Sequence, residues 1–230
     1  NKLAQQYYEK AIGLDPNFAR AYGSLAVAKI MSANNFTIEN HLEEKDLALD
    51  LAKKATSLNK QSQNTYWSLG FTHLYRKEYE EAVNAVQKSL KIAPSYADGH
   101  ALLALIYNYQ GKSKNSIKLI EKAMKLNPHY SWDYLFNLGW ANYSLGNYKK
   151  AQELLNEAIE RNENSRLTRL FIIANLVAQG NIDDAEWEVE ELLLQYPSIT
   201  ISSIQKYMPL VSNEKTVTFL AHLKTAGISN

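Results

Sequence analysis

The chain has 230 residues, enough for one large domain or two small ones. Its 25 Lys and Arg residues nearly balance 24 Asp and Glu residues, so the net charge of +1 gives no bulk electrostatic reason to expect nucleic-acid binding. Cysteine is absent from the sequence, which excludes disulfide scaffolds, thiolate zinc sites and cysteine nucleophiles. No apolar run approaches the roughly 18 residues of a membrane-spanning helix, so we expect no membrane insertion.

The first predicted element is a single helix in residues 1–16, which ends before Pro16. Its apolar residues follow a helical spacing, at Ala4, Tyr8 and Ala11. The segment has the pattern of the second helix of a two-helix unit, without the first helix. We therefore expect the chain to be part of a longer protein with further sequence upstream.

A period of about 34 residues runs through the rest of the chain. Pro94 and Pro128 lie 34 residues apart in similar contexts, and Gly111, Gly146 and Gly180 keep the same period. Each of these glycines stands between two segments with helical apolar periodicity. The pattern predicts two antiparallel helices in every period, joined by a glycine turn.

This pattern resembles the tetratricopeptide repeat, whose signature is W-x2-L-G-x2-Y, then A-x3-F and a closing proline. The match is carried by small and apolar residues, at Tyr66, Leu69, Gly70 and Ala82 and again at Leu135, Leu138, Gly139 and Ala151. Departures occur where Lys60 and Glu163 replace the closing proline and Ile173 replaces a small residue. The resemblance implies an all-α fold, a right-handed α-α superhelix.

The expected solenoid covers residues 1–197 and contains a leading half-repeat and five full repeats. Their predicted bounds are 1–16 for the half-repeat and about 17–60, 61–94, 95–128, 129–163 and 164–197 for the full repeats. The first full repeat carries about ten extra residues within 31–44, which either lengthen both helices or form a protruding turn. Residues 198–230 are predicted to form two helices that cap the last repeat.

A search for catalytic and metal-binding patterns finds none in the sequence. The five histidines include no pair at the i, i+3 or i+4 spacing of a helical metal site. The glycine motifs of phosphate loops and nucleophile elbows are also missing. We therefore expect a non-enzymatic protein with no catalytic residues, no metal and no cofactor.

The resemblance implies that the first helix of each repeat lines a concave groove. Aromatic and aliphatic residues occupy the positions where chaperone-binding members carry a Lys/Asn/Arg clamp for a carboxylate, so that clamp is missing. The residues predicted to line the partner-binding groove are Trp67, Phe71, Tyr75, Asn108, Tyr109, Phe136, Asn137, Trp140, Tyr143 and Phe171.

Aromatic rings at these positions predict a large exposed apolar patch. In soluble monomers such a patch is rarely left uncovered. We expect the occupant to be an apolar or amphipathic segment of a protein or peptide partner. The alternative is that the rings pack against each other or against the C-terminal helices of the same chain.

Two charged segments remain. Lys114, Lys118, Lys122 and Lys125 align on one helix face, and residues 183–191 are rich in Asp and Glu. We expect a solvated convex surface, with contact between the basic stripe and an anionic partner or another molecule's acidic helix as the alternative.

A narrower resemblance is carried by residues 122–151 and by the ending FLAHLKTAGI. They are similar to the C-terminal repeat regions of bacterial signalling proteins with class III adenylate/guanylate cyclase domains, and of regulators with winged-helix domains. The resemblance implies a cytoplasmic regulatory or scaffolding tail that does not itself bind nucleic acid. A self-association module of a transcriptional regulator or cyclase, and hence a homo-oligomer, is the alternative.

Overall fold

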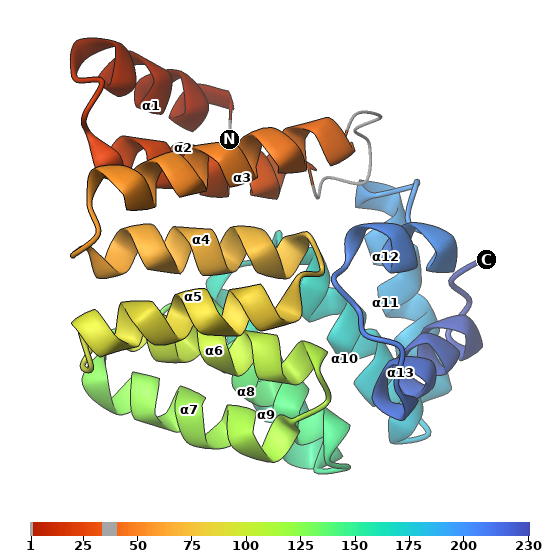
Figure 1. Ribbon diagram of the computed structural model, residues 1–230. Helices are drawn as coiled ribbons and strands as arrows, with labels where there is room; N and C mark the ends of the chain where they lie inside the picture. Colours follow the sequence, from red (N-terminus) through yellow and green to blue (C-terminus); the bar gives the residue numbers. More distant parts are fainter. Residues whose placement is uncertain (1, 34–40) are drawn as a thin grey trace. The chain divides into compact units, whose positions relative to one another are not determined.

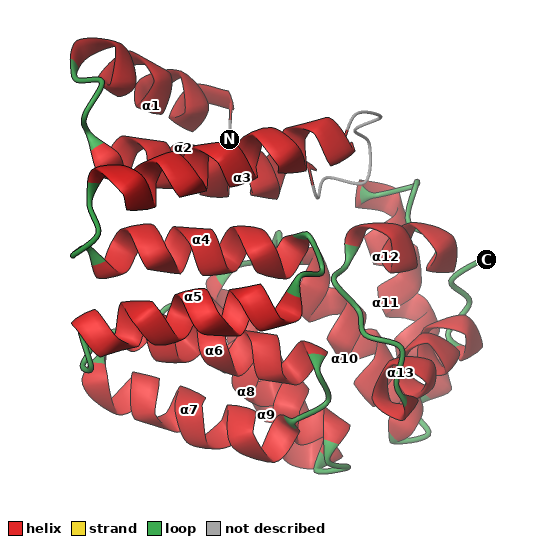
Figure 2. Ribbon diagram, in the orientation of Figure 1, coloured by secondary structure: helices red, strands yellow, loops and turns green. Residues whose placement is uncertain are grey.

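A computed structural model describes residues 2–33 and 41–230, and within these ranges the chain is built of α-helices and loops without strands (Figure 2). The predicted all-α fold is therefore confirmed. The helices are α1 (Lys2–Leu14), α2 (Ala19–Ala33), α3 (His41–Leu58), α4 (Gln63–Tyr75), α5 (Tyr79–Ile92), α6 (Ala97–Tyr109), α7 (Ser113–Leu126), α8 (Trp132–Ser144), α9 (Tyr148–Arg161), α10 (Arg166–Ala178), α11 (Ile182–Gln195), α12 (Ile201–Tyr207) and α13 (Glu214–Thr225).

The helices from α4 to α11 repeat one two-helix unit. Its first helix has 13 residues in α4, α6, α8 and α10, and its second has 14 residues in α5, α7, α9 and α11. Equivalent helices begin 34 or 35 residues apart, the period seen in the sequence. In the first full repeat α2 and α3 are longer, with 15 and 18 residues, so the extra residues lengthen both helices. The remainder of that insertion, residues 34–40, lies outside the described residues.

The turns inside the units share one backbone conformation. Gly111, Gly146 and Gly180 have φ values of 72°, 80° and 83°, in the left-handed region that glycine adopts without steric cost. At the equivalent place between α4 and α5 stands Lys77, with φ 66°. A residue with a Cβ is strained there, so this turn is less favourable than its counterparts.

We expect Lys77→Gly to raise the free energy of unfolding by up to about 1 kcal/mol, because relief of strain outweighs the added flexibility of the unfolded chain. Gly146→Ala is the matched reverse change, since no atom lies within 4 Å of the added Cβ and backbone strain alone acts. It should lower the free energy of unfolding by about 1 kcal/mol. Urea unfolding measures both values. A destabilised Lys77→Gly variant would show that contacts of the Lys77 side chain outweigh the strain.

Small residues allow the two helices of a unit to touch. A Cβ on Gly70 of α4 would lie 2.5 Å from Val86 Cγ2 and 3.1 Å from the Ala82 carbonyl oxygen in α5. The second contact is with backbone and cannot be relieved by a rotamer change. A larger residue at position 70 would therefore force α5 away from α4.

The chain forms two compact units, Asn1–Leu102 with Tyr207–Pro209 and Leu103–Lys206 with Leu210–Asn230. In unit 1, α2 packs against α3 and α4, and α4 packs against α5 (Figure 1). A core cluster of buried apolar side chains joins α2 to α3, and it contains Ala26, Ile30, Ala48 and Ala52. In unit 2, α8 packs against α7 and α9, and α10 packs against α9, α11 and α13.

Candidate functional site

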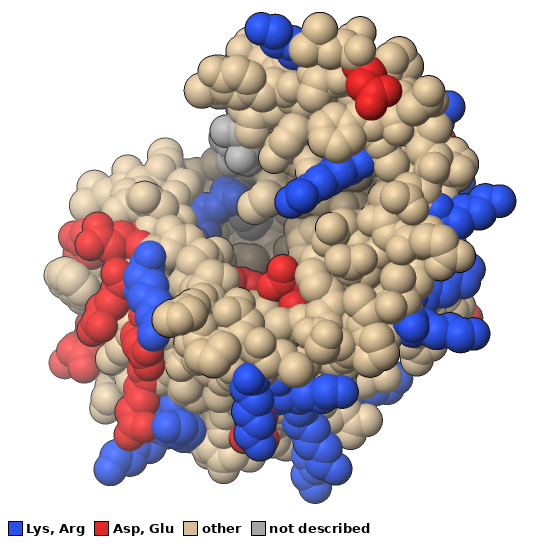
Figure 3. Space-filling view, turned by 90° about the vertical axis from the view of Figure 1, so that its left-hand side faces the viewer, with Lys and Arg blue, Asp and Glu red and all other residues tan. Residues whose placement is uncertain are grey.

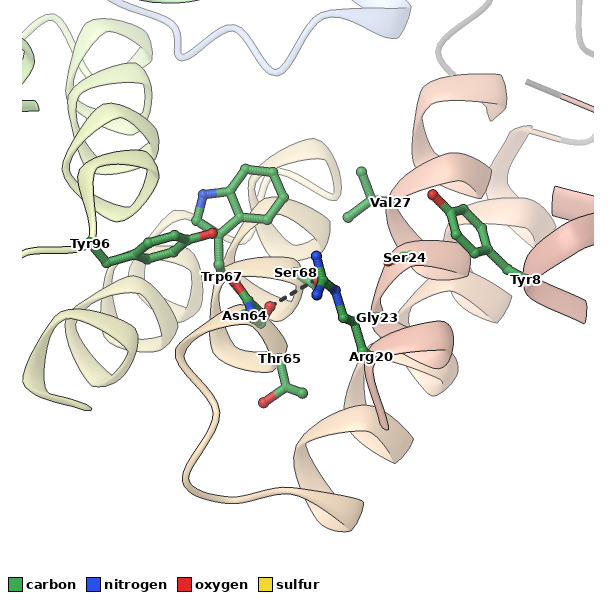
Figure 4. Close-up of a pocket in the computed structure, with 10 residues that line it drawn as sticks. All are labelled: Tyr8, Arg20, Gly23, Ser24, Val27, Asn64, Thr65, Trp67, Ser68 and Tyr96. Atoms are coloured by element: carbon green, nitrogen blue, oxygen red, sulfur yellow. Dashed lines mark hydrogen bonds between the residues drawn. The ribbon is translucent and has the colours of Figure 1, made fainter. Parts of the chain in front are cut away.

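A pocket of about 210 Å³ opens on unit 1 between the first helices α2 and α4 (Figure 4). One residue of α1 and one residue just before α6 complete its walls. The lining residues are Tyr8, Arg20, Gly23, Ser24, Val27, Asn64, Thr65, Trp67, Ser68 and Tyr96.

The floor of the pocket lies where the first helices of two successive repeats touch. Gly23 and Ser68 lie at the contact between α2 and α4, where a Cβ on Gly23 would lie 3.0 Å from Ser68 Oγ. The Ser68 hydroxyl donates a hydrogen bond to the Asn64 carbonyl oxygen at 3.0 Å, within its own helix (Figure 4). Small side chains thus leave space above the contact, and larger ones on either side form the walls.

The indole ring of Trp67 is a fixed wall of this pocket. Its Nε1–H donates a hydrogen bond of 2.9 Å to the Asp98 carbonyl oxygen. The ring stacks on Phe71 at 5.3 Å, and Phe71 contacts Tyr75 at 4.8 Å between centroids. Because Phe71 and Tyr75 pack against the core cluster, this row of rings holds Trp67 in place.

The polar groups of the pocket give it positive character. Among the described residues that line the pocket, Arg20 is the one basic residue and none is Asp or Glu. Burial raises the pKa of Tyr96, Asp98 raises it further, and the nearby Arg20 charge opposes them, so its phenol is neutral at physiological pH. A guanidinium, phenols and the Asn64 amide therefore surround an aromatic wall. Such a site can bind an apolar side chain of a ligand and form hydrogen bonds to the polar groups of the ligand around that side chain.

The predicted groove residues of unit 2 are buried. Their exposed fractions are at most 5%, for Asn108, Tyr109, Phe136, Asn137, Trp140, Tyr143 and Phe171. Trp140 contacts Tyr109 edge-on at 4.6 Å and Phe171 at 4.7 Å between centroids. The expectation that these residues form an exposed patch is therefore wrong.

The cover of these rings is the chain's own helix α13. Phe219 stacks on Phe171 at 4.4 Å with an interplanar angle of 17°. His222 Nδ1 lies 2.8 Å from the Tyr143 hydroxyl. Burial lowers the pKa of His222, against the opposing effect of a hydrogen bond to the Ala174 backbone. Burial also raises the pKa of Tyr143, so a neutral phenol donates to a neutral imidazole.

The space that remains beside α13 is too small for a side chain. It measures about 10 Å³, with Trp140, Tyr143 and Phe171 on one side and Phe219 on the other. This is about the size of one water molecule. The alternative derived from the sequence, that the C-terminal helices of the same chain pack on the rings, describes unit 2.

Of the ten predicted groove residues, Trp67, Phe71 and Tyr75 are partly exposed, and Trp67 alone of the ten lines the unit-1 pocket. The lining residues of the first full repeat were not predicted from the sequence. They are Arg20, Gly23, Ser24 and Val27, which lie 44 positions before groove positions of the second repeat. Tyr8 and Tyr96 had no such signal, because they lie outside the first helices that carry the groove positions.

Two further findings concern residues 2–33 and 41–230. No three His, Asp or Glu side chains within them are placed to hold a metal ion. None of their helices combines the length and the apolar character that crossing a membrane requires.

Comparison with known sequences agrees with the repeat pattern. Two sequence profiles of the tetratricopeptide repeat match the chain, one at residues 95–164 and the other at residues 1–18 and 64–96. No curated protein sequence matches it.

Several solved structures share the fold. A thermophilic repeat protein of Thermus thermophilus, TTC0263, is 20% identical over 80% of this chain and 92% of its own, with a TM-score of 0.60. The Cut9–Hcn1 hetero-tetramer of APC/C gives 19% identity over 97% of this chain, with a TM-score of 0.72. Human IFIT1, solved as a dimer with m7Gppp-AAAA, gives 16% identity over the whole chain, also with 0.72. This chain spans 39% of the matched chain in the Cut9–Hcn1 structure and 55% of the IFIT1 chain.

Proposed function

The chain belongs to the tetratricopeptide-repeat family, and from this premise we propose that it is a non-enzymatic protein-interaction scaffold whose unit-1 pocket binds an apolar or amphipathic segment of a protein partner. The observation that carries the proposal is the fixed and partly exposed ring of Trp67 at an open pocket. Aromatic rings of this kind dominate binding energies, because they bury much area with little loss of conformational entropy.

The size of the pocket limits what enters it. An apolar cavity of roughly 150 Å³ holds a benzene molecule, so about 210 Å³ accommodates one aromatic or branched side chain. Small-molecule sites are typically larger, at about 300–1,000 Å³. The walls also offer the Asn64 amide and the Ser24 hydroxyl for hydrogen bonds to a peptide backbone. These features favour a single anchoring side chain on an extended or helical segment.

We expect Trp67→Ala to weaken binding of a selected peptide by about tenfold or more, as is usual for a hot-spot ring. The probe is a fluorescent peptide selected on the wild-type protein from a random library, and fluorescence anisotropy measures its affinity. Circular dichroism should show unchanged helicity, because the Trp67 side chain is only half-buried.

The matched control is Tyr7→Ala, which removes a ring that is 63% exposed on α1 and does not line the pocket. It should leave the affinity unchanged. Equal affinities of the wild type and Trp67→Ala, or selection of no peptide at all, would contradict the proposal.

A finer part of the proposal concerns the parent protein. The similarity of residues 122–151 to the repeat regions of bacterial signalling proteins supports a role as a cytoplasmic regulatory tail that does not itself bind nucleic acid. The complete reading frame of the gene tests this. A cyclase or winged-helix domain encoded in it would support the role, and a reading frame without either would contradict it.

A further inference from the structure

The outer faces of the second helices in unit 2 differ sharply in charge. Four positions spaced along each of these helices are equivalent from repeat to repeat. They are Lys114, Lys118, Lys122 and Lys125 in α7; Lys149, Glu153, Glu157 and Glu160 in α9; and Asp183, Trp187, Glu191 and Leu194 in α11. The face thus changes from wholly basic to acidic and apolar within three repeats.

The α7 face carries four exposed lysines. None of them forms an ion pair among the described residues. The repulsion among these lysines would be relieved by an acidic surface brought against them.

The α11 face has the opposite charge and an exposed apolar part. The helix sequence IDDAEWEVEELLLQ contains six acidic residues and no basic residue. One acid, Glu188, is neutralised by Arg169 of α10. On the outer face Trp187 is 57% exposed and Leu194 is 78% exposed. An indole among carboxylates is well suited to lysine ammonium groups, which both the charges and the ring face attract.

The order of the three helices makes the surface self-complementary. Both α7 and α9 pack against α8, and both α9 and α11 pack against α10. Hence α9 lies between the basic α7 and the acidic α11. In the space-filling view of Figure 3, many of the Asp and Glu side chains gather on the left-hand side, with Lys and Arg side chains beside them.

We propose that two copies of the chain pair through this face, with a two-fold axis at α9, so that α7 of each copy lies against α11 of the other. A two-fold axis brings each residue pair together twice. Lys118 and Lys122 of one copy then meet Trp187 and Glu191 of the partner copy, and the reverse contact forms on the other side of the axis. At the axis α9 meets the α9 of the partner copy. Two of its outer carboxylates, Glu153 and Glu157, are neutralised by Lys150 and Arg161 of the same helix.

The size of the surface sets the strength of the pairing. A helix of 14 residues is about 21 Å long and packed helices lie about 10 Å apart, so three of them present on the order of 400–600 Å². The pair would bury about 1,000 Å² in total, at the lower end of specific interfaces. The dimer is therefore weak, concentration-dependent and sensitive to salt.

The experiment uses sedimentation velocity over a concentration series of the whole chain. We expect a monomer–dimer equilibrium whose dissociation constant rises about tenfold between about 0.05 M and about 0.5 M salt. Trp187→Ala should raise it about tenfold. Two charge-reversal variants, Lys114→Glu with Lys122→Glu and Asp183→Lys with Glu191→Lys, should each be monomeric. In each variant the two pairs of charges that face each other, at positions 114 with 183 and 122 with 191, have the same sign.

Mixing the two reversal variants is the decisive measurement. Each variant alone brings like charges together at these pairs, but a mixed dimer of the two variants restores opposite charges at both contacts and should form. A folding defect in either variant could not produce this rescue. The matched control is Lys53→Glu with Lys54→Glu on α3, which makes the same change at exposed lysines elsewhere and should leave dimerisation intact.

Three results would overturn the proposal. A wild type that stays monomeric at low salt and high concentration would show that the charged faces are merely solvated. Growth beyond two copies would show an open chain of contacts instead of a two-fold pair. A dimer that the reversal variants retain, or that their mixture does not restore, would place the interface elsewhere.

Discussion

Deletion of residues 198–230 should lower the melting temperature sharply and increase self-association of the protein. Helix α13 covers Tyr143 and Phe171, whose exposed fractions are 5% and 1% in its presence. Apolar side chains at the end of the last repeat, expected from the sequence to include Ile172, Leu176, Val189 and Leu193, lose cover in the same deletion. Differential scanning calorimetry and light scattering measure the two effects. A truncated protein that associates no more than the intact chain and keeps its melting temperature would contradict the prediction.

A single substitution separates the role of α13 from that of the rest of the deleted segment. Phe219→Ala should lower the free energy of unfolding by about 3–5 kcal/mol, as is typical for a phenylalanine removed from a core. Val217→Ala, on the same helix but at a site 64% exposed, should change it by less than about 0.5 kcal/mol. Urea unfolding of the two variants tests whether the stacked ring, and not the presence of a helix, provides the cover.

The periodic part of the fold could be predicted from the sequence, because each repeat meets the same local requirements. The glycine turns need a left-handed conformation, and Gly70 must leave room for α5. Such constraints act between residues close in sequence and return every 34 or 35 positions. Period and spacing therefore predicted an all-α repeat fold of paired helices.

The occupant of the unit-2 groove could not be predicted in this way. The hydrogen bond between Tyr143 and His222 joins residues 79 positions apart, and the segment containing His222 has no repeat partner. Periodicity identifies which positions face the groove but not what covers them. The sequence around Trp140 does not indicate whether a partner or α13 covers the ring.

The first full repeat shows the converse difficulty. Arg20 and Gly23 occupy the groove positions that Asn64 and Trp67 occupy in the next repeat. Because the first full repeat contains about ten extra residues, the two sets do not follow the common period. Arg20 and Gly23 also lack the aromatic rings found at groove positions of the later repeats. The pocket depends on that difference, because a ring in place of Gly23 would fill it.

Two tryptophans predicted to share one groove should therefore respond differently to the same change. Trp140→Ala is expected to lower the free energy of unfolding by about 3–5 kcal/mol, since the ring is 5% exposed and packs among Tyr109, Phe136 and Phe171. Trp67→Ala removes a half-buried ring at an open pocket, so the loss should be about 1 kcal/mol and concern mainly its stacking and hydrogen bond. The effects should add in the double variant, because the two rings lie in different units and share no partner.

Urea unfolding followed by far-ultraviolet circular dichroism measures these losses, with Trp187→Ala as the control for removing an indole that is 57% exposed. That control should change the free energy of unfolding by less than about 0.5 kcal/mol. If Trp140→Ala were as stable as Trp67→Ala, α13 would leave the unit-2 groove readily in solution, and the rings beneath it would be available to a partner as the sequence first indicated. A large loss places Trp140 in the core and leaves Trp67 as the tryptophan through which the first helices can bind a ligand.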